Sequence, residues 1–509
     1  MYKALSLGLC AAMALLASPP ASAQKAKDTL RIAANDQYSI LSPYELPLDE
    51  ASPFYNEIYS PLIVLNENTG QYMPELAKAW RHIDDKTIEF DLRDDITLHT
   101  GKKFNADDIA ASINYAIDPQ VKIRSKNRYT WVKSVEKLGP DKIRVHLKKP
   151  YALDLFAFAY RFTTMDSDVL SKLENKADYG RVSGASAGPY RIVSYDRNTG
   201  FILQRFDKLN IAHRRAPIGR INIVPITDDQ TQIAQLLTGG LDVLRNVSES
   251  NAVELAKQPN VEVTPTESSQ YVYMTIDAIG RSGRKEFMDQ RVRKAMAMAI
   301  NREQIAKEII PGGRKVGEVM QALCFPFTVG CSYTVTPPAH NVAEAKKLMA
   351  EAGFANGLDL VIQVHEPYKD IAVAIAGQLR DIGIRATVQP MTISTYIRAR
   401  EDGKLTVFVG SRPTANFPET IEMLEAFFEG SRDYWKDDLI AQTIEKARMV
   451  TDDKERAKVL TPALDRNNSQ VYVLPLATTP WVFAHSKEVR IGSNQIKART
   501  VNVSDIFWK

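Results

Sequence analysis

Residues 77–109 read AKAWRHIDDKTIEFDLRDDITLHTGKKFNADDI. Within this stretch, Thr87 to Arg93 (TIEFDLR) alternates apolar and polar side chains, which is the period of a strand with one buried face. Asn105 precedes an apolar pattern that includes Ile109 and Ile113, four residues apart as on one face of a helix. Its side-chain oxygen can accept a hydrogen bond from an early helix N–H. The stretch therefore predicts a half-exposed strand followed by a capped helix.

Similar short strands flank this stretch. Lys142 to Leu147 alternates in the same way after a Gly139-Pro140 turn, and Thr29 to Ala34 (TLRIAA) is typical of a first strand. Tyr190 to Phe206 predicts a strand pair around the turn that ends at Gly200. The first half of the chain is therefore expected to be mixed α/β, with antiparallel strands.

Beyond Gln270 the pattern changes to helices that alternate with single strands, which predicts a second α/β lobe. A chain of this length, about 485 residues without its first segment, exceeds what one core usually supports. No low-complexity linker separates the two parts, so ordered crossing strands and a hinge are expected. The expected elements are a helix at Arg291–Ile309, a helix at Ala343–Ala352, a strand at Leu358–Val364, a helix at Ala372–Ile382 and a strand at Ile384–Gln389.

The N-terminus has the layout of a cleaved Sec signal peptide, with Lys3, an apolar run from Ala4 to Leu16, and Ala21-Ser22-Ala23 before the cut. Residues 1–23 are therefore expected to be removed. The apolar run is too short to span a bilayer, and Cys10 is expected to leave with the signal. A secreted mature protein follows from this prediction.

Cys324 and Cys331 are the two cysteines that remain, with six residues between them. In an oxidising compartment such a pair is expected to close a small disulfide loop. Two reduced, buried thiols are the alternative, because the sequence does not show how close the two Cα atoms come.

The composition excludes several function classes. Lys and Arg (65) nearly balance Asp and Glu (61), and the charges are interspersed, so nucleic acid is not an expected partner. The seven histidines are scattered without metal-ligand spacing, and no phosphate loop or dinucleotide glycine fingerprint is present. One Gly-x-Ser-x-Gly match at residues 184–188 lacks the strand and helix of a nucleophile elbow. No metal, no cofactor and no catalytic residue are therefore expected.

The ordered motifs of this chain resemble the family 5 extracellular solute-binding proteins, which include oligopeptide- and dipeptide-binding proteins of ABC importers. The resemblance covers nearly the whole mature chain and is most specific at residues 77–109. The segments that carry it are the strand ending Phe90-Asp91-Leu92-Arg93, then Leu98-His99-Thr100-Gly101, Phe104-Asn105-Ala106-Asp107-Asp108-Ile109, Ala187-Gly188-Pro189-Tyr190, Val292 to Glu303, and Ala345 to Gly353.

The resemblance implies a two-lobed periplasmic binding protein fold, α/β in class, with hinge-crossing strands and an extra mixed α+β subdomain in the first lobe. The first lobe is expected at residues 24–54 and 181–268, with the subdomain inserted at 55–180. The second lobe is expected at residues 269–476, and residues 477–509 return to the first lobe. Closing two such lobes excludes water from a ligand and strengthens each polar contact.

Peptide binders in the family place an aspartate after a tryptophan, and that carboxylate holds the ammonium group of the ligand. The matching loop here has Pro413 at the tryptophan position and Asn416 at the aspartate position. A neutral amide cannot neutralise an ammonium charge, and a buried unpaired charge is costly. Either Glu419 supplies the carboxylate or the ligand lacks a free ammonium. Arg412 is a candidate bidentate partner for a carboxylate or phosphate of the ligand.

Three tyrosines are candidate walls of the ligand pocket. The segment Gln270 to Asp277 is expected to cross between the lobes, and one face of it must look into the cleft. Tyr271 and Tyr273 are therefore candidate ligand contacts, as is Tyr38 in the loop after the first strand. Packing in the protein core is the alternative for each of them.

The sequence thus predicts a periplasmic substrate-binding component of an ABC importer that is not an enzyme. It is expected to be a monomer that captures a small peptide and delivers it to an inner-membrane permease with cytoplasmic ATPases. One alternative is an anionic solute, such as an opine-like or sugar-phosphate conjugate, motivated by Arg412 and Asn416. Another alternative is a periplasmic chaperone or receptor module on the same fold.

Overall fold

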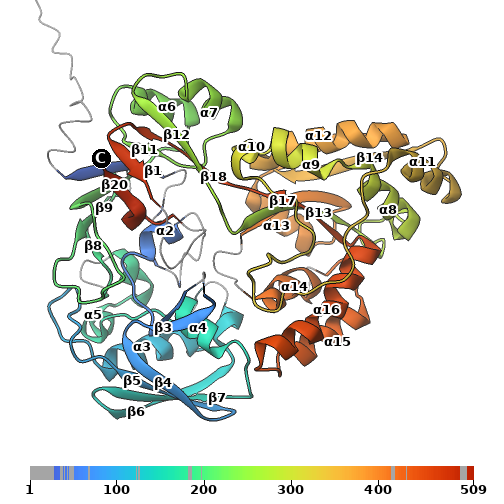
Figure 1. Cartoon of the computed structure of the whole chain (residues 1–509). Helices are drawn as coiled ribbons and strands as arrows, with labels where there is room; N and C mark the ends of the chain where they lie inside the picture. Colours follow the sequence, from blue (N-terminus) through green and yellow to red (C-terminus); the bar gives the residue numbers. More distant parts are fainter. Residues whose placement is uncertain are drawn as a thin grey trace, which may run out of the picture.

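Three main sheets organise the chain in the computed structural model (Figure 1). The structure describes residues 28–34, 38, 40–42, 44, 51–66, 69–121, 123, 126–181, 186–196, 198–413, 419–430, 433–492 and 501–509. Its mixed α/β class agrees with the prediction. Among the helices in these ranges, none combines the length and the apolar character that crossing a membrane requires.

The first lobe is built on a seven-stranded sheet. Its strands are, in spatial order, β12 (Val261–Thr266), β18 (Trp481–Ser486), β11 (Val243–Leu244), β1 (Thr29–Ala34), β10 (Arg220–Pro225), β9 (Gly200–Arg205) and β8 (Tyr190–Asp196). Strand β1 pairs with β10 in parallel, whereas β10, β9 and β8 are antiparallel. The predicted first strand and the predicted pair from Tyr190 are therefore confirmed. Helices α6 (Asp229–Leu237) and α7 (Glu249–Leu255), and the pair β19 (Val489–Ile491) and β20 (Ile506–Trp508), complete this part.

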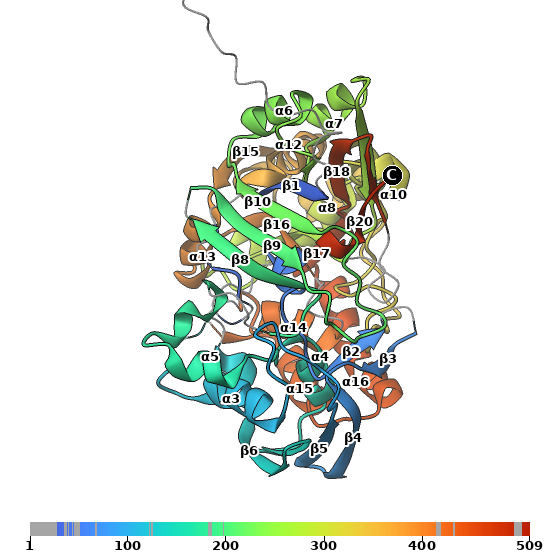
Figure 2. The same ribbon diagram turned by 90° about the vertical axis from the view of Figure 1, so that its left-hand side faces the viewer.

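A four-stranded antiparallel sheet lies below it (Figure 2), in the order β4 (Ala77–Asp84), β5 (Thr87–Leu92), β7 (Lys142–Leu147) and β6 (Val132–Gly139). Helix α3 (Ala106–Ile117) begins after Asn105, whose side chain accepts from the Asp107 backbone N–H at 2.9 Å. The carboxylate of Asp108 accepts from the Asn105 N–H in return. This reciprocal capping confirms the predicted start of the helix. The remaining elements are α2 (Ser52–Tyr55), β2 (Ile63–Asn66), β3 (Gln71–Pro74), α4 (Asp154–Tyr160) and α5 (Ser167–Lys172).

The second lobe is built on a five-stranded sheet, with the order β15 (Ile384–Met391), β14 (Leu358–His365), β16 (Val407–Pro413), β13 (Gln270–Ile276) and β17 (Val473–Thr478). One face packs on α8 (Gln290–Ala299), α11 (Val342–Glu351) and α12 (Lys369–Leu379). The opposite face packs on α13 (Ile393–Glu401), α14 (Thr420–Phe428), α15 (Asp438–Ala447) and α16 (Asp453–Gln470). The two apolar layers give this lobe a core of its own.

The long helix predicted at Arg291–Ile309 is wrong as one element. Helix α8 ends at Ala299, and a short helix α9 (Arg302–Gln304) runs into a π-helical turn at Ile305–Ile309. Asn301 causes the break, because its side chain accepts a hydrogen bond from the Gln304 N–H at 3.0 Å. Asparagine competes in this way with helix continuation and favours a helix start.

Two chain segments cross side by side between the lobes. The chain passes from β12 to β13 through residues 267–269, and it returns from β17 to β18 through residues 479–480. The Ser268 hydroxyl donates to the Thr479 carbonyl, and the Thr479 N–H donates to the Gln270 carbonyl at 2.9 Å. The paired crossing is the architecture of a hinge. The segment Gln270 to Asp277, predicted to cross between the lobes, instead forms β13 of the second-lobe sheet up to Ile276, and the crossing lies just before it.

Candidate ligand cleft

Strand β13 presents two tyrosines to one side of the second lobe. Because side chains alternate along a strand, Tyr271 and Tyr273 share a face, while Val272 packs in the opposite layer. Both tyrosines are buried, with ring centroids 6.3 Å apart. The Tyr271 ring meets Phe325 at 5.8 Å, and the Tyr273 ring meets Phe427 of α14 at 4.9 Å. These rings form what we call the aromatic wall, consisting of Tyr271, Tyr273, Phe325 and Phe427.

Arg412 adds a positive charge to the aromatic wall. It lies opposite Tyr271 in the pairing of β13 with β16, and its guanidinium lies 5.9 Å from the centre of the Phe427 ring. Burial lowers the pKa of Arg412 below its usual value, although the two tyrosines act in the opposite direction. A guanidinium held in this way is suited to an anionic group of a ligand.

First-lobe side chains continue the same apolar cluster across the lobe boundary. Leu153 and Phe156 belong to the cluster that contains Tyr271, and Tyr72 of β3 packs against it. The Ala152 N–H donates to the Arg448 carbonyl of the second lobe at 3.3 Å. The candidate site is therefore the contact between the lobes, to which both lobes contribute aromatic side chains.

An ion pair also spans this boundary, between Arg161 at the end of α4 and Glu422 of α14. Their side chains are only 7% and 5% exposed. Neither residue was predicted from the sequence, since neither stands in a motif. An arginine directly after the aromatic helix DLFAFAY was the only local signal.

Glu419 lies at the start of α14 and is bonded within its own lobe. Arg456 of α16 donates to both carboxylate oxygens through Nη2, at 3.1 and 3.2 Å. Burial raises the pKa of Glu419 to about 8, because the loss of solvation outweighs the attraction of Arg456. The ligand role of Glu419 stays a prediction, and this carboxylate already has a partner. Asn416, which stands at the position of the ammonium-binding aspartate, lies outside the described residues.

The sulfur atoms of Cys324 and Cys331 are bonded to each other, with the Cα atoms 5.6 Å apart. The loop they close carries Phe325 of the aromatic wall. It also holds the start of α14, because the Thr420 N–H donates to the Val329 carbonyl at 2.9 Å. The loop thus connects two parts of the cleft wall.

Tyr38 lies elsewhere, in the core of the first lobe. Its ring packs against Phe54 with centroids 6.2 Å apart, and the side chain is buried. The structure therefore brings Tyr271, Tyr273 and Arg412 together but places Tyr38 in a different core. Its ligand role stays a prediction.

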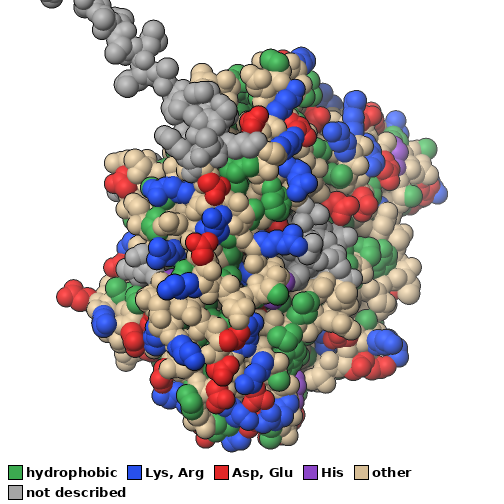
Figure 3. All heavy atoms as spheres, turned by 60° about the vertical axis from the view of Figure 1, so that its left-hand side comes forward, with side chains coloured by type: hydrophobic (Ala, Val, Ile, Leu, Met, Phe, Trp, Pro, Cys, Tyr) green, Lys and Arg blue, Asp and Glu red, His purple; other side chains and the backbone are tan. Residues whose placement is uncertain are grey.

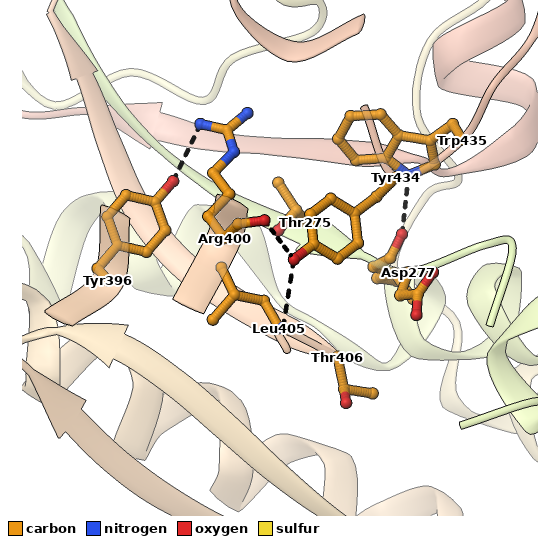
Figure 4. Close-up of a pocket in the computed structure, with 9 residues that line it drawn as sticks. Thr275, Asp277, Tyr396, Arg400, Leu405, Thr406, Tyr434 and Trp435 are labelled. Atoms are coloured by element: carbon orange, nitrogen blue, oxygen red, sulfur yellow. Dashed lines mark hydrogen bonds between the residues drawn. The ribbon is translucent and has the colours of Figure 1, made fainter. Parts of the chain in front are cut away.

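Behind the aromatic wall, a small pocket lies inside the second lobe (Figure 4). Arg400 donates to the Tyr396 hydroxyl at 3.1 Å, and the Tyr434 hydroxyl donates to the Arg400 carbonyl at 2.9 Å. Trp435 donates to the Ile276 carbonyl at 2.8 Å. Since these polar groups bond to one another, we interpret the pocket as part of the lobe interior that supports Tyr273.

The surface offers no single-sign patch on the face shown in Figure 3, where basic and acidic side chains are interspersed. Within the ranges that the structure describes, no group of three or more His, Cys, Asp or Glu side chains is arranged to hold a metal ion.

Comparisons with known proteins agree with this architecture. The glutathione-binding protein GsiB of Escherichia coli K12 is 24% identical in an alignment 508 residues long, which covers 94% of this chain and 93% of GsiB. A dipeptide-binding protein from Pseudoalteromonas sp. SM9913, solved with Met-Leu, superposes with a TM-score of 0.78 at 20% identity, covering 94% of this chain and 100% of that one.

The binding protein AgaA from A. tumefacien R10, solved with agropinic acid, has a TM-score of 0.74 at 20% identity, with 94% and 99% of the two chains covered. These likenesses show the two-lobed fold of periplasmic binding proteins. The model of the bacterial extracellular solute-binding proteins, family 5, matches residues 71–435, which is more than half of the sequence. The chain therefore belongs to family 5 of the bacterial extracellular solute-binding proteins, the non-enzymatic binding components of ABC transporters.

Proposed function

We propose that this protein captures a small peptide between its lobes in the periplasm and delivers it to an inner-membrane ABC permease. The observation that carries the proposal is the inter-lobe cluster, a single buried cluster that contains Tyr271 and Tyr273 of the second lobe and Phe156 of the first. Aromatic walls with few polar groups suit side chains of varied size. Relatives that bind glutathione and Met-Leu support the same class of ligand.

Within this proposal, Arg412 binds the carboxylate of the peptide. Its guanidinium is held over Phe427, so a ligand carboxylate that reaches it meets a partly desolvated charge. Charge-assisted hydrogen bonds are stronger in such surroundings than in water. The removal of residues 1–23, the periplasmic location and a monomeric state belong to this proposal as well.

A second candidate function is the import of an anionic solute that is not a peptide. Arg412 favours it, because its guanidinium lies over Phe427 in surroundings that lower its pKa, and an anionic group of a ligand would stabilise that charge. The relative AgaA, solved with agropinic acid, supports this alternative.

Native mass spectrometry of the mature protein, purified without denaturation, tests the proposal. Retained masses that match short peptides support peptide import, whereas a retained non-peptide anion supports the second candidate. Isothermal titration with Met-Leu and with glutathione then measures affinity directly. Retention of no peptide, together with no heat from either compound, contradicts peptide import.

A further inference from the structure

Glu422 is placed between the two lobes in a way that the proposed function does not require. It projects from the first turn of α14, and its Oε1 is paired with Arg161 of the opposite lobe. The guanidinium of Arg161 also lies 5.1 Å from the centre of the Phe156 ring, and its Nη1 donates to the Tyr151 hydroxyl at 3.4 Å. Arg161 is thus fixed on the first-lobe side by contacts of its own lobe.

The second carboxylate oxygen of Glu422 is buried and has no hydrogen-bond partner within the described part of the chain. The Tyr271 hydroxyl, in the apolar cluster at the lobe boundary, is also buried, and it too has no hydrogen-bond partner among the described residues. Buried polar atoms are nearly always paired, and leaving one unpaired costs free energy. A donor that arrives with a ligand removes that cost.

We propose that Glu422 couples solute capture to lobe closure. Its Oε1 accepts from Arg161 and holds the lobes together, and its Oε2 accepts a hydrogen bond from an N–H group of the bound solute. This inference rests on the proposed function as far as the solute is concerned, and it adds the chemical class, a solute with N–H donors. Lobe closure through Arg161 is independent of the solute.

The neighbouring turn of α14 offers a matched control. Glu425 is paired with Arg448 at 3.0 Å, and both residues belong to the second lobe. Replacing Glu425 by glutamine removes one carboxylate from the same helix without touching the pair between the lobes. The comparison therefore separates the loss of any carboxylate from helix α14 from the loss of the ion pair that joins the lobes.

Closure is tested first, without any ligand, by small-angle X-ray scattering. Glu422→Gln is expected to increase the radius of gyration relative to wild type, and Glu425→Gln is expected to leave it unchanged. The charge exchange Arg161→Glu with Glu422→Arg is expected to restore the wild-type value, because it rebuilds the pair. Equal radii for all four proteins overturn the inference, and circular dichroism shows that each variant is folded.

Solute binding is tested by titration calorimetry with Met-Leu and with glutathione. Glu422→Gln is expected to weaken binding by roughly tenfold or more, since the acceptor of the solute N–H loses its charge. Unchanged affinity in Glu422→Gln overturns the solute half of the inference. If the wild type binds neither compound, the proposed function fails, while the scattering comparison still decides whether Glu422 holds the lobes together.

Discussion

Arg456 Nη2 lies 3.1 and 3.2 Å from the two carboxylate oxygens of Glu419 inside the second lobe, and the two side chains are 1% and 4% exposed. Arg456 also donates through Nη1 to the Val450 carbonyl at 2.8 Å. The pair joins the start of α14 to the start of α16. It therefore supports the helix that carries Glu422 and Phe427 from behind.

Replacing Arg456 by methionine is expected to destabilise the protein by about 1 to 3 kcal/mol, because it leaves the buried carboxyl oxygens of Glu419 without their hydrogen-bond donor. Urea unfolding measures the loss. Lys458→Met on the same helix is the control, since Lys458 pairs with Glu455 at the surface, where an exposed pair contributes little to stability. Equal stability of the two variants contradicts a structural role for Arg456.

His99 is expected to make the protein sensitive to acid. Its Nε2 lies 2.9 Å from the Gly188 carbonyl, and its Nδ1 lies 3.3 Å from the Ser186 backbone nitrogen. Burial lowers the pKa of His99 to about 4, from 6.5 for an exposed histidine. Between these values the unfolded chain binds a proton that the folded chain does not, so stability falls as the pH falls from 6.5 through 4. The shift corresponds to about 3 kcal/mol.

Urea unfolding at a series of pH values between 4 and 7 tests the His99 prediction. The His99→Gln variant is expected to lose much of the pH dependence in this window, although it is less stable at pH 7. His146→Gln is the control, because His146 is partly exposed and pairs with Glu136. The same slope in wild type and His99→Gln contradicts the assignment.

Much of the fold was predictable because its signals are local. The strand at Thr87 to Arg93 and the cap at Asn105 depend on neighbouring residues, and both are present. The strand is not half-exposed as predicted, because its polar side chains are covered as well, Glu89 by its ion pair with Arg144. The break at Asn301 was not predicted, because the apolar pattern continues through it and an asparagine there is compatible both with a continuous helix and with the start of a new one. The residue pattern alone therefore predicts helices and strands well, but it predicts breaks within a helix less well.

The candidate site was predictable only in part. The period of a strand places Tyr271 and Tyr273 on one face, and the structure shows that they share it. In contrast, the pairing of Arg161 with Glu422 joins residues that are far apart in sequence and that meet only when two lobes face each other. No local pattern contains such a contact. Glu419 looked available from the sequence because its partner Arg456 is equally distant.

Gly188 is expected to tolerate no side chain. A Cβ at this position would lie 2.3 Å from the Glu57 carbonyl oxygen and 2.5 Å from the Ile58 carbonyl, and both are backbone atoms. Gly188→Ala is therefore expected to cost about 3 kcal/mol, as overpacking against a rigid backbone does. Gly377→Ala in α12 is the control, because a Cβ there meets nothing within 4 Å. It is expected to be neutral or to stabilise by about 0.5 to 1 kcal/mol. A stable Gly188→Ala variant contradicts this packing.

The disulfide is expected to stabilise the second lobe by restricting the unfolded chain. For a loop closed by residues seven apart, the chain-entropy model gives about 2 kcal/mol. The double variant Cys324→Ala with Cys331→Ala, compared with wild type under oxidising and reducing conditions, measures this contribution. Thiol titration of the denatured, unreduced protein shows whether the bond forms. Two free thiols in the wild type would contradict it.

Arg412 is expected to decide whether an anionic group of the solute is held. It lies beside Tyr271 and over Phe427, where burial already disfavours its charge, so a ligand carboxylate relieves that cost as well as forming hydrogen bonds. Arg412→Met is expected to weaken binding of Met-Leu and of glutathione by about 10- to 100-fold, the range for a hydrogen bond to a charged group.

Arg412→Glu is expected to abolish that binding, because it adds repulsion to the lost contact. Arg398→Met is the matched control for both variants, since Arg398 lies on the exposed side of α13. Titration calorimetry with both compounds measures the difference. If Arg412→Glu binds as the wild type does, Arg412 is a packing residue of the aromatic wall. Arg128 of the first lobe is then the next arginine to substitute, because it is close enough to influence the pKa of Arg412.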